Sequence, residues 1–560
     1  MNNKMNNIMC KSNDRVLLLF LFLLNLVCNG VWLSQQFGIL SLALVVTLSA
    51  ICAVVETFVA SLLKPFPVRI IFVSLVIFIH NLIGLVDYYL LYQFGMVIDM
   101  SIIDTVLVTN THEAMEFTSA YFSPMVIVLL IGALLVNVVA YMVARLWGKN
   151  VISTLVVRLF AILGVAFLVV NVILIIFFHT SVGVSTPMHH SIARVMWEYG
   201  RVTHETHIGN LLHVCQDVKA ARKDNGPLKM IVIIGESHSV YHTSLYGYKK
   251  QTYPLMEDRE SNGELFVFQN AVTTNDVTAL VMNSVFSLDS MGVDFNEYPL
   301  FPAVFKAAGF RTALYDNEYL ADESLYLMTN STLSNLLYDQ RNTHYYDYDG
   351  DMIRDISLYK DSLALYVLHL AGHHVRYDKR YPQSFAKFKT NDYGGSYSDD
   401  QKKDIAAYDN ASLYNDYIIN EVIRMFEDEN AVMVYFSDHG EEVYEVQDYR
   451  GHGTAKYTPD IRYQLRVPFW VWLSDKYRDQ HLPVVDKLRK ALDLHVKTDD
   501  MPYFLIDLAD IDTEWMKPDR SFITDGIYHG WKDYREMIIS QDGFNTNEGD
   551  HMRQFKKETE

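Results

Sequence analysis

The chain has 560 residues, which is too many for one ordinary domain, and its formal net charge is −19. This charge argues against a nucleic acid partner and against simple electrostatic adhesion to an anionic membrane. Cysteine is scarce, with 4 residues in all, and Cys215 is the only one after residue 182, so no intrachain disulfide is expected in the second part of the chain.

Five long apolar runs dominate the first 180 residues. Each run is long enough for a helix that crosses about 30 Å of hydrocarbon, which takes about 20 residues. A single N-terminal run could be a cleaved signal peptide, but five cannot. The sequence therefore predicts a five-helix transmembrane domain, with its helices at residues 16–33, 37–63, 70–93, 124–144 and 159–178.

Basic residues occur only in alternate connections between these runs. Lysine and arginine are found before the first run, at residues 64–69 and at residues 145–158, whereas residues 96–123 carry acidic residues and neither Lys nor Arg. Because basic connections stay in the cytoplasm, the N-terminus is expected there. Five crossings then place the chain after residue 179 on the opposite side of the membrane.

Residues 183–227 are expected to bridge the two parts of the chain. Residues 189–215 carry apolar side chains at helical spacing and predict an interfacial helix, with a plain connector as the alternative. Residues 216–227 are polar and end in Asn-Gly-Pro, which is typical of a linker, and residues 345–351 indicate a polar loop. The predicted domains are the transmembrane domain at 1–182, the bridge at 183–227, a catalytic domain at 228–545 and a polar C-terminal tail at 546–560.

Strands and helices alternate from residue 228 onward. This alternation predicts an α/β domain with a mainly parallel sheet covered by helices. The strands are expected at residues 229–234, 265–270, 311–315, 362–370, 431–436 and 467–473, and helices at 300–308 and 404–427.

Two of these predicted strands end in residues that bind metals. One apolar run ends in Asp438 and His439, and about 200 residues upstream another ends in Glu236. The carboxyl ends of parallel strands meet at one edge of a sheet, where open α/β folds place their chemistry. The sequence therefore predicts a metal site that contains Glu236, Asp438 and His439. For either strand end alone, a helix cap is the alternative interpretation.

Three further segments carry residues that can act in catalysis or bind a metal. They are the threonine-rich residues 273–278, the pair His373-His374, and His452. With the two strand ends, they resemble the alkaline phosphatase/sulfatase superfamily. More narrowly, the chain resembles the membrane-anchored phosphoethanolamine transferases that modify lipopolysaccharide in Gram-negative bacteria. The resemblance covers the whole architecture. It rests on Thr109-Asn110-Thr111-His112-Glu113-Ala114, Gly235-Glu236-Ser237, Leu245-Tyr246-Gly247-Tyr248, Lys379-Arg380-Tyr381-Pro382, Tyr408-Asp409-Asn410 and Ser437-Asp438-His439-Gly440-Glu441.

The resemblance implies that a threonine at the start of a helix is the nucleophile. The family pattern places it eight residues before a Phe-Ser pair, and Phe286-Ser287 then selects Thr278, with Thr274 in reserve. A hydroxyl at a helix N-terminus gains from the positive end of the helix dipole. Simple capping of the helix by Thr278 is the alternative.

The resemblance also implies zinc. Glu236, Asp438 and His439 would bind one Zn²⁺, with Thr278 completing a mixed O/N ligand set that is typical of catalytic zinc. His374 and His452 match family positions near the phosphoryl group, where they would bind a second zinc or donate a proton.

Three other histidines are alternatives near this site. His373 competes with His374 for its position, and the family spacing favours His374. His238 and His242 follow Glu236 closely and could contact the metal site, although two helix-surface histidines explain them equally well.

The function that the resemblance implies is a two-step transfer. Thr278 would take phosphoethanolamine from phosphatidylethanolamine, and a hydroxyl or phosphate of lipopolysaccharide (core sugar or lipid A) or a periplasmic glycan would then accept it. The enzyme would be a monomer in the bacterial inner membrane, with its catalytic domain in the periplasm. The intramembrane Glu56, His80 and Asp87 are costly in lipid; mutual pairing is favoured, and contact with the donor headgroup is the alternative.

Three rival functions remain in view. A glycerol-phosphate transferase of the lipoteichoic-acid-synthase type has the same architecture but a phosphatidylglycerol donor. A membrane sensor would keep the fold and bind phospholipid headgroups without turnover. A sulfatase is disfavoured, because the chain has no Cys/Ser-x-Pro-x-Arg motif.

The chain departs from the lipid A-modifying members of the family in its cysteines. Those members carry several disulfides in the external domain, one of which flanks the nucleophile, and the corresponding positions here are Thr274 and Ser284. This difference favours members that act on core heptose or on periplasmic glucans.

Overall fold

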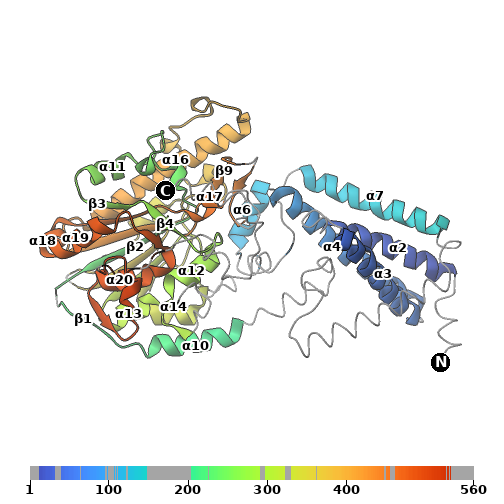
Figure 1. The fold of residues 1–560 in the computed structure, drawn as a ribbon, viewed down its shortest axis with the longest axis horizontal. Helices are drawn as coiled ribbons and strands as arrows, with labels where there is room; N and C mark the ends of the chain where they lie inside the picture. Colours follow the sequence, from blue (N-terminus) through green and yellow to red (C-terminus); the bar gives the residue numbers. More distant parts are fainter. Residues whose placement is uncertain are drawn as a thin grey trace. The chain divides into compact units, whose positions relative to one another are not determined.

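In the computed structural model, the chain divides into two compact units, whose helices and strands are labelled in Figure 1. The first comprises residues 1–106 and 121–202, and the second comprises residues 107–120 and 203–560. The structure describes residues 12–31, 39–63, 65–94, 98, 106, 109, 111–121, 124–147, 204–224, 226–289, 297–321, 329–360, 362–446, 449–453, 461–524, 526, 528 and 530.

Apolar helices make up the described part of the first unit. Helices α3, α4 and α7 contain candidate membrane spans by length and composition, at Val45–Leu62, Phe66–Gln93 and Val126–Trp147. The first predicted run forms helix α2, of 19 residues. The fifth, at residues 159–178, lies outside the described residues, so five crossings remain a prediction. The helix bounds are α2 Ser12–Gly30, α3 Ile39–Leu62, α4 Phe66–Phe94 and α7 Pro124–Trp147.

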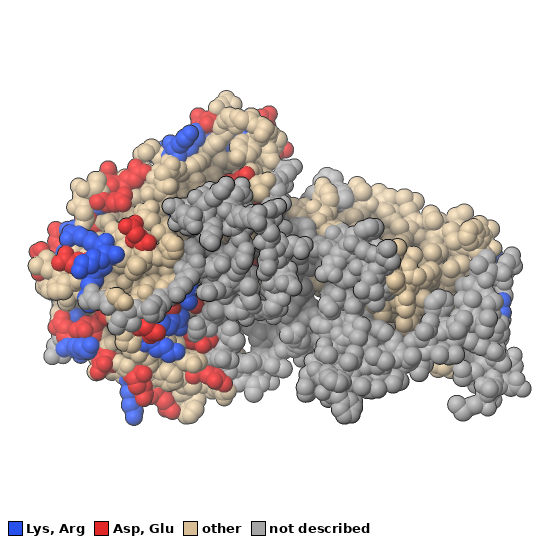
Figure 2. Space-filling view, viewed as in Figure 1, with Lys and Arg blue, Asp and Glu red and all other residues tan. Residues whose placement is uncertain are grey.

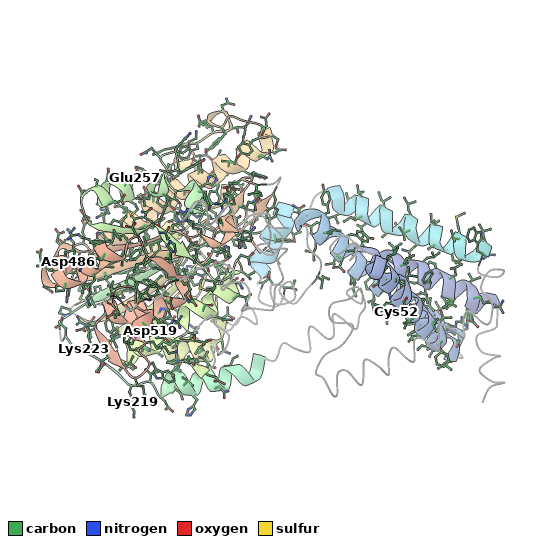
Figure 3. The ribbon with its side chains drawn as sticks, viewed as in Figure 1. Cys52, Lys219, Lys223, Glu257, Asp486 and Asp519 are labelled. Atoms are coloured by element: carbon green, nitrogen blue, oxygen red, sulfur yellow. The ribbon has the colours of Figure 1, made fainter. Side chains whose placement is uncertain are left out.

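Helix α7 turns large apolar side chains outward. Leu134 and Leu135 are 68% and 59% exposed, and Ile127, Leu130, Ile131 and Val138 are also exposed. Figure 2 shows this part of the chain almost without charged residues, whereas Lys, Arg, Asp and Glu intermingle over the second unit. Figure 3 places Cys52 on α3 of the same apolar unit. An apolar surface of this kind is what a lipid bilayer solvates.

The three charged or titratable side chains singled out in the predicted membrane helices have polar partners. His80 Nε2 lies 3.2 Å from Glu56 Oε1, and Asn25 donates to the other Glu56 oxygen at 3.0 Å. Asp87 Oδ1 accepts a hydrogen bond from the backbone N–H of Ile98 at 2.7 Å. Pairing within the helices therefore accounts for Glu56 and His80, while the backbone supplies a partner for Asp87.

A seven-stranded sheet forms the centre of the second unit, in the order β3-β11-β8-β2-β7-β5-β6. Strand β11 is antiparallel to both neighbours, and the pairs β8-β2, β2-β7, β7-β5 and β5-β6 are parallel. The sheet is thus mixed and mainly parallel. The bounds are β2 Lys229–Gly235, β3 Leu265–Phe268, β5 Arg311–Asp316, β6 Gln340–Arg341, β7 Ala364–His369, β8 Ala431–Ser437 and β11 Phe469–Leu473.

Helices cover both faces of this sheet, because its central strands carry apolar side chains on both faces, as in β2. All its residues are buried, and successive side chains point to opposite faces. Ile231 and Ile233 belong to the hydrophobic cluster that includes α11 and α16, whereas Val232 and Ile234 belong to the cluster that includes α12, α13 and α20 (Figure 1). The helix bounds are α11 Pro254–Ser261, α12 Thr278–Phe286, α13 Phe301–Ala307, α16 Asp399–Phe426 and α20 Met501–Leu508.

The predicted linker and polar loop differ from the structure. Within 216–227, strand β1 (Ala220–Arg222) pairs antiparallel with β13 (Ile511–Thr513), and Figure 3 shows Lys219 and Lys223 at its two ends. Helix α15 (Asp349–Arg354) begins inside the predicted loop 345–351. Both elements are too short to show a hydrophobic period, and their partners are distant in sequence. In the predicted bridge at 183–227, the described residues form α10 (His204–Gln216), followed by β1.

Candidate active site

The parallel pairing of β2 and β8 brings the two predicted strand ends together. Gly235 is in register with Ser437, so Glu236 and Asp438 follow at adjacent positions of the sheet edge. Glu236, Asp438 and His439 are each 0% exposed. Ser237 adopts a left-handed conformation with φ of 54°, and its N–H donates to Asp438 Oδ1 at 3.1 Å. The sheet edge therefore gathers two carboxylates and one imidazole in the interior.

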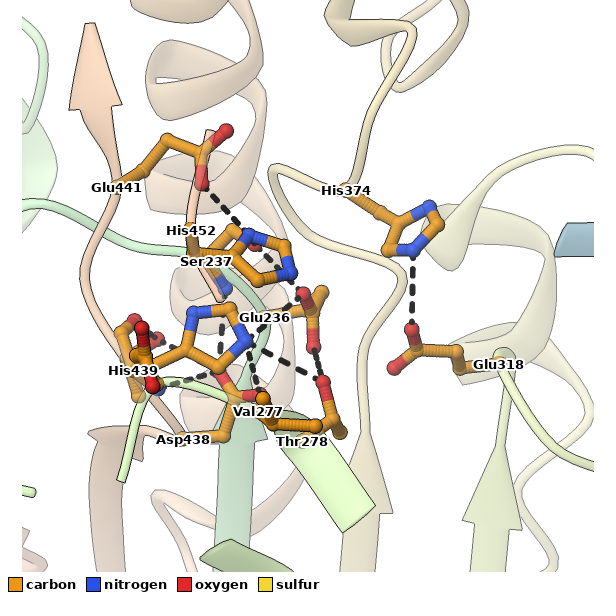
Figure 4. A network of polar contacts seen from close by, with 12 residues as sticks. Glu236, Ser237, Val277, Thr278, Glu318, His374, Asp438, His439, Glu441 and His452 are labelled. Carbon is orange, nitrogen blue, oxygen red and sulfur yellow. Dashed lines mark hydrogen bonds and ion pairs between the residues drawn. The ribbon is translucent and has the colours of Figure 1, made fainter. Parts of the chain in front are cut away.

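Thr278 lies beside this group, as Figure 4 shows. It is the first residue of α12, and its Oγ1 lies 3.2 Å from Glu236 Oε2 and 3.3 Å from His439 Nε2. The N-cap of α12 is Val277, and no side chain caps the helix, which argues against a capping role for Thr278. Among the described residues, the buried Thr274 Oγ1 has no hydrogen-bond partner, so the structure does not bring Thr274 into this cluster.

The spacing of these polar atoms fits a shared cation. His439 Nε2 lies 3.1 Å from Asp438 Oδ2 and 3.7 Å from Glu236 Oε1, besides the two Thr278 contacts. Ligands at the corners of a tetrahedral zinc site, each about 2.0–2.2 Å from the metal, are separated by about 3.3 Å. Glu236, Thr278, Asp438 and His439 thus have both the chemistry and the spacing of a catalytic metal site.

The buried negative charge at this edge of the sheet also favours a bound cation. Burial raises the pKa of Glu236 well above its ordinary value, and the nearby Asp438 and Glu318 carboxylates raise it further. Buried ionised groups persist in proteins when they are paired or bind a metal. A divalent cation between Glu236 and Asp438 would remove this repulsion, so the residues fit the zinc that the family resemblance implies.

His452 lies against the same cluster and is held by Glu441. Its ring centroid is 3.9 Å from that of His439, and its Nδ1 lies 2.8 Å from Glu441 Oε2 and 3.3 Å from Ser237 Oγ. Tyr377 donates its hydroxyl proton to the other Glu441 oxygen. Burial alone would lower the pKa of His452, but the Glu441 carboxylate, with Asp438 and Asp276, outweighs it and raises that pKa. A carboxylate in this position fixes the imidazole and favours its protonated form.

His374 lies on the other side of Glu236, where it faces Glu318 (Figure 4). Its Nε2 lies 3.5 Å from Glu318 Oε1. Gly372 makes the approach of this loop possible, because its φ is +44° and a Cβ there would lie 3.0 Å from Glu236 backbone atoms.

The described residues offer two groups of metal ligands in this region. One contains Glu236, His439 and His452; the other contains Glu236, Glu318 and His374, and within each group the donor atoms lie within 4.8 Å of one another. The two histidines predicted to share a second zinc thus fall into separate groups, linked by Glu236.

The three alternative histidines point elsewhere. His373 Nε2 contacts Ser412 Oγ at 2.9 Å, and its ring stacks on His238. His238 contacts the Tyr435 and Thr243 hydroxyls, both at 2.7 Å, and His242 Nδ1 contacts Asp409 at 2.7 Å. These histidines therefore belong to buried hydrogen-bond networks and not to the candidate metal groups.

Sequence reasoning assigned no role to Glu318, Glu441, Ser237 or Tyr377. Glu441 belongs to the strand-end motif itself, and Glu318 follows β5 by two residues, so the strand-end rule could have found both. The contacts of Ser237 and Tyr377 come from loop conformations that have no signal in the local sequence.

A mainly parallel sheet with a helix-start threonine facing Glu, Asp and His at its carboxyl edge defines the alkaline phosphatase/sulfatase-like class. Residues 229–511 match the model of the sulfatase family, and the chain belongs to that family. Residues 54–185 match the family model described as phosphoethanolamine transferase EptA/EptB. The resemblance to membrane-bound phosphoethanolamine transferases is therefore confirmed.

Proteins similar to this chain include named phosphoethanolamine transferases. The chain is 25% identical over 434 residues to phosphoethanolamine transferase EptC of Escherichia coli O18:K1:H7, which covers 70% of this chain and 72% of that protein. The integral membrane lipooligosaccharide phosphoethanolamine transferase A (EptA) of Neisseria meningitidis shares the fold, with a TM-score of 0.58, 17% identity and coverage of 90% of this chain and 96% of that chain.

A relative has been solved with zinc. The periplasmic domain of EptC from Escherichia coli, in complex with Zn, matches with a TM-score of 0.52 and 24% identity, over 57% of this chain and 91% of that chain. This likeness shows a common fold for the second unit.

Proposed function

We propose that the protein transfers phosphoethanolamine from phosphatidylethanolamine to lipopolysaccharide or a periplasmic glycan, through a covalent intermediate on Thr278. The observation that carries this proposal is the position of Thr278 Oγ1, 3.2 Å from Glu236 Oε2 and 3.3 Å from His439 Nε2 at the start of α12. The phosphoethanolamine transferases among the relatives support the choice of headgroup.

Glu236, Thr278, Asp438 and His439 would hold a zinc ion. When bound, zinc lowers the pKa of a coordinated hydroxyl and offsets negative charge on a phosphoryl group. Ser237 donates its hydroxyl proton to Glu236 Oε1 at 2.6 Å, and its N–H donates to Asp438, so both carboxylates are oriented before substrate arrives. Ligand positions fixed in this way need little reorganisation during reaction.

In the first half of the reaction Thr278, its hydroxyl proton released to water beforehand, would form a bond between Oγ1 and phosphorus, while the bond from phosphorus to the diacylglycerol oxygen breaks. That oxygen needs a proton as it leaves. His452 is placed to supply it, because Glu441 holds Nδ1 at 2.8 Å and raises the pKa of the ring. In the second half, the acceptor oxygen attacks phosphorus, the Thr278–phosphorus bond breaks, and His452 takes the acceptor's proton.

The apolar helices of the first unit would keep the site at a bilayer surface, where donor and acceptor are concentrated. We place the N-terminus in the cytoplasm, and the second unit in the periplasm, on the arrangement of basic residues. A monomer contains all the proposed site residues.

Reconstitution tests the proposed donor. The purified full-length chain is incorporated into vesicles that contain lipopolysaccharide with either phosphatidylethanolamine or phosphatidylglycerol, and the acceptor is analysed by mass spectrometry. We expect a phosphoethanolamine addition with the first donor and none with the second. A glycerol-phosphate addition would overturn the proposal in favour of the lipoteichoic-acid-type activity, and no addition with either donor would favour a binding protein without turnover.

A further inference from the structure

A polar pocket of about 510 Å³ lies beside the edge strand β6, outside the proposed zinc site. Its volume is within the range of pockets that bind small molecules or parts of larger ones. The walls come from β6, from the loop that follows it and from helix α14 (Ser331–Leu337). None of the lining residues takes part in the proposed reaction. They include Asn335, Gln340, Thr343, His344, Tyr346 and Ser357.

Two aromatic rings form part of the pocket wall. The ring centroids of His344 and Tyr346 are 4.5 Å apart, and the ring planes are inclined at 47°. His344 is exposed and Tyr346 is half-buried, so both rings offer surface to a ligand. Aromatic rings of this kind can pack against the C–H face of a sugar while the sugar hydroxyls remain free for hydrogen bonds.

Hydrogen bonds hold this pair of rings in place. The Tyr346 hydroxyl donates to Asp355 Oδ2 at 3.0 Å, and the Tyr346 backbone N–H donates to Asn317 Oδ1 at 2.8 Å. The side-chain amide of Asn342 donates to the carbonyl oxygen of His344 at 3.0 Å. The loop is therefore ordered before a ligand arrives, which reduces the entropic cost of binding.

The charges around the pocket do not suit an anionic ligand. Asp339 Oδ1 lies 3.2 Å from Lys306 Nζ, and Asp339 Oδ2 lies 3.4 Å from Arg311 Nε, so these cations are paired. Arg341 is the one Lys or Arg among the described lining residues. It is in register with Leu314, and the two residues also line a separate, smaller cavity. Phosphates and carboxylates are bound by such cations, so a neutral ligand fits this pocket better.

The other lining groups suit a ligand with many hydroxyls. Asn335 and Thr343 have exposed side chains that can both donate and accept hydrogen bonds. The Tyr315 hydroxyl accepts the N–H of Ser357 at 3.0 Å and can donate its own proton to a ligand. None of the described lining residues is aliphatic, which argues against an apolar ligand. Aromatic rings, amides and hydroxyls together indicate a neutral sugar.

The pocket lies on the same sheet as the proposed zinc site. Strands β6, β5, β7 and β2 are neighbours in that order, and at about 4.8 Å per strand β6 lies about 14 Å from β2, which ends next to Glu236. Asn342 Oδ1 accepts the N–H of Asp316 at 2.9 Å, so the pocket loop begins at the carboxyl edge of the sheet. A glycan of several sugars could therefore reach both places.

We propose that this pocket binds a neutral sugar of a glycan, stacked on the His344–Tyr346 pair. While this sugar is held, another part of the same glycan would accept phosphoethanolamine from Thr278. Holding the acceptor at a second point raises its effective concentration at the reacting atoms. The role as an acceptor subsite rests on the proposed function, whereas the binding of a glycan does not.

Binding of isolated glycans tests the pocket itself. The full-length chain is purified in a detergent without a sugar headgroup and titrated calorimetrically with two probes. One probe is the core oligosaccharide of lipopolysaccharide, freed of lipid and phosphate, and the other is a linear glucan oligosaccharide. We expect the wild type to bind at least one of them, and the probe that binds more tightly identifies the source of the glycan. Binding of neither probe would overturn the proposal.

Substitutions place the bound glycan in the pocket. Tyr346→Ala and His344→Ala should each weaken binding by about 5-fold or more, because an aromatic contact is lost, whereas Tyr346→Phe keeps the ring and should stay within about 2-fold of the wild type. The matched control is Tyr417→Ala, which removes a tyrosine on α16 that is 36% exposed and lies outside the pocket. Wild-type affinity in both alanine variants of the pocket would overturn the proposal. If Tyr346→Ala is unfolded by circular dichroism, His344→Ala decides alone.

Transfer kinetics test the role of the pocket in the reaction. The acceptor glycan that binds is compared with the same glycan shortened to its attachment sugar. In Tyr346→Ala, the ratio of kcat/KM for the long acceptor to kcat/KM for the short one should fall about 5-fold, mainly through KM. An unchanged ratio in an active enzyme would refute the acceptor subsite and leave the proposed function intact. Glycan binding without any transfer would support the pocket and refute the proposed function.

Discussion

Two buried polar clusters in the second unit differ in the length of the contacts between their side chains. In the Asp409 cluster, His242, Tyr248 and Tyr393 contact the Asp409 carboxylate at 2.7, 2.9 and 2.5 Å. In the Thr278 cluster, the contacts that Thr278 and His439 make with Glu236, Asp438 and each other are 3.1 to 3.7 Å long. In the first cluster, N–H and O–H groups donate short hydrogen bonds to the carboxylate. In the second cluster, the longer distances and the excess of carboxylates leave room and charge for a cation.

Charge separates the two clusters as well. Burial would lower the pKa of His242, but the Asp409 and Glu445 carboxylates outweigh it and raise that pKa to about 10, so the imidazolium has a carboxylate partner at each ring nitrogen. At Glu236, burial and the neighbouring carboxylates act in the same direction. A buried charged network whose members are paired with one another can be purely structural, whereas a buried cluster of carboxylates with strongly raised pKa indicates a functional site. Each prediction below would break or sharpen this contrast.

Thr278→Ala should have the largest effect. Loss of the nucleophile is expected to reduce phosphoethanolamine transfer by about 10⁴-fold or more. Thermal stability should change little, because Thr278 does not cap α12 and because Glu236, Asp438 and His439 remain to hold the cation. The rate is measured by mass spectrometry of the acceptor. Thr274→Ala is the matched control and should retain activity within a few-fold; equal losses in the two variants would remove Thr278 from its role.

Chelation should abolish transfer and also lower the melting temperature. Removing a cation leaves the Glu236 and Asp438 carboxylates facing each other, so the folded state loses the stabilisation that ligand binding gives. Calorimetry and transfer assays before and after zinc is restored measure both effects. Full activity in a chain shown by elemental analysis to be metal-free would end this interpretation of the Thr278 cluster.

Glu441→Gln should reduce transfer by about 10- to 100-fold, the usual cost of removing a carboxylate that orients a functional histidine. The zinc should remain bound, because Glu441 contacts His452 and Tyr377 rather than the proposed ligands. Transfer rate and zinc content are measured together on the same preparation. Loss of zinc in parallel with activity would show that Glu441 acts on the metal and not on His452.

His242→Gln should change stability and leave the metal in place. Removing one partner of a buried ion pair costs about 3 kcal/mol of unfolding free energy, since the buried Asp409 carboxylate loses its cationic partner. Chemical denaturation monitored by circular dichroism gives this value, and elemental analysis gives the zinc content. A variant that loses zinc while keeping wild-type stability would reverse the proposed roles of the two clusters.

The same pair predicts a pH dependence of stability. The pKa of His242 is raised from 6.5 to about 10, so its stabilising contribution is complete below pH 6.5 and is lost as the pH rises through the folded-state value. The melting temperature of the wild type should therefore fall more steeply between pH 6.5 and 10 than that of His242→Gln. Parallel curves would show that the His242–Asp409 pair does not titrate in this range.

The sequence predicted the parts of the site that follow from strand ends. Glu236, Asp438 and His439 come directly after buried strands, and the parallel pairing of β2 and β8 then brings them together. The contact of His374 Nδ1 with Glu116 Oε2, on helix α6 (Thr111–Tyr121), could not be predicted, because no local pattern relates this helix to a loop more than 250 residues away. Strand β1 was missed for the same reason: its partner β13 lies near the other end of the domain.

One measurement tests the central claim that Thr278 is a nucleophile activated by a metal. Zinc-loaded and zinc-depleted chains are exposed to phosphatidylethanolamine without an acceptor, digested, and the peptide that contains residue 278 is sequenced by mass spectrometry. We predict phosphoethanolamine on Thr278 in the zinc-loaded chain and an unmodified peptide in the depleted chain. An adduct on another residue, an adduct formed equally without zinc, or no adduct at all would contradict it.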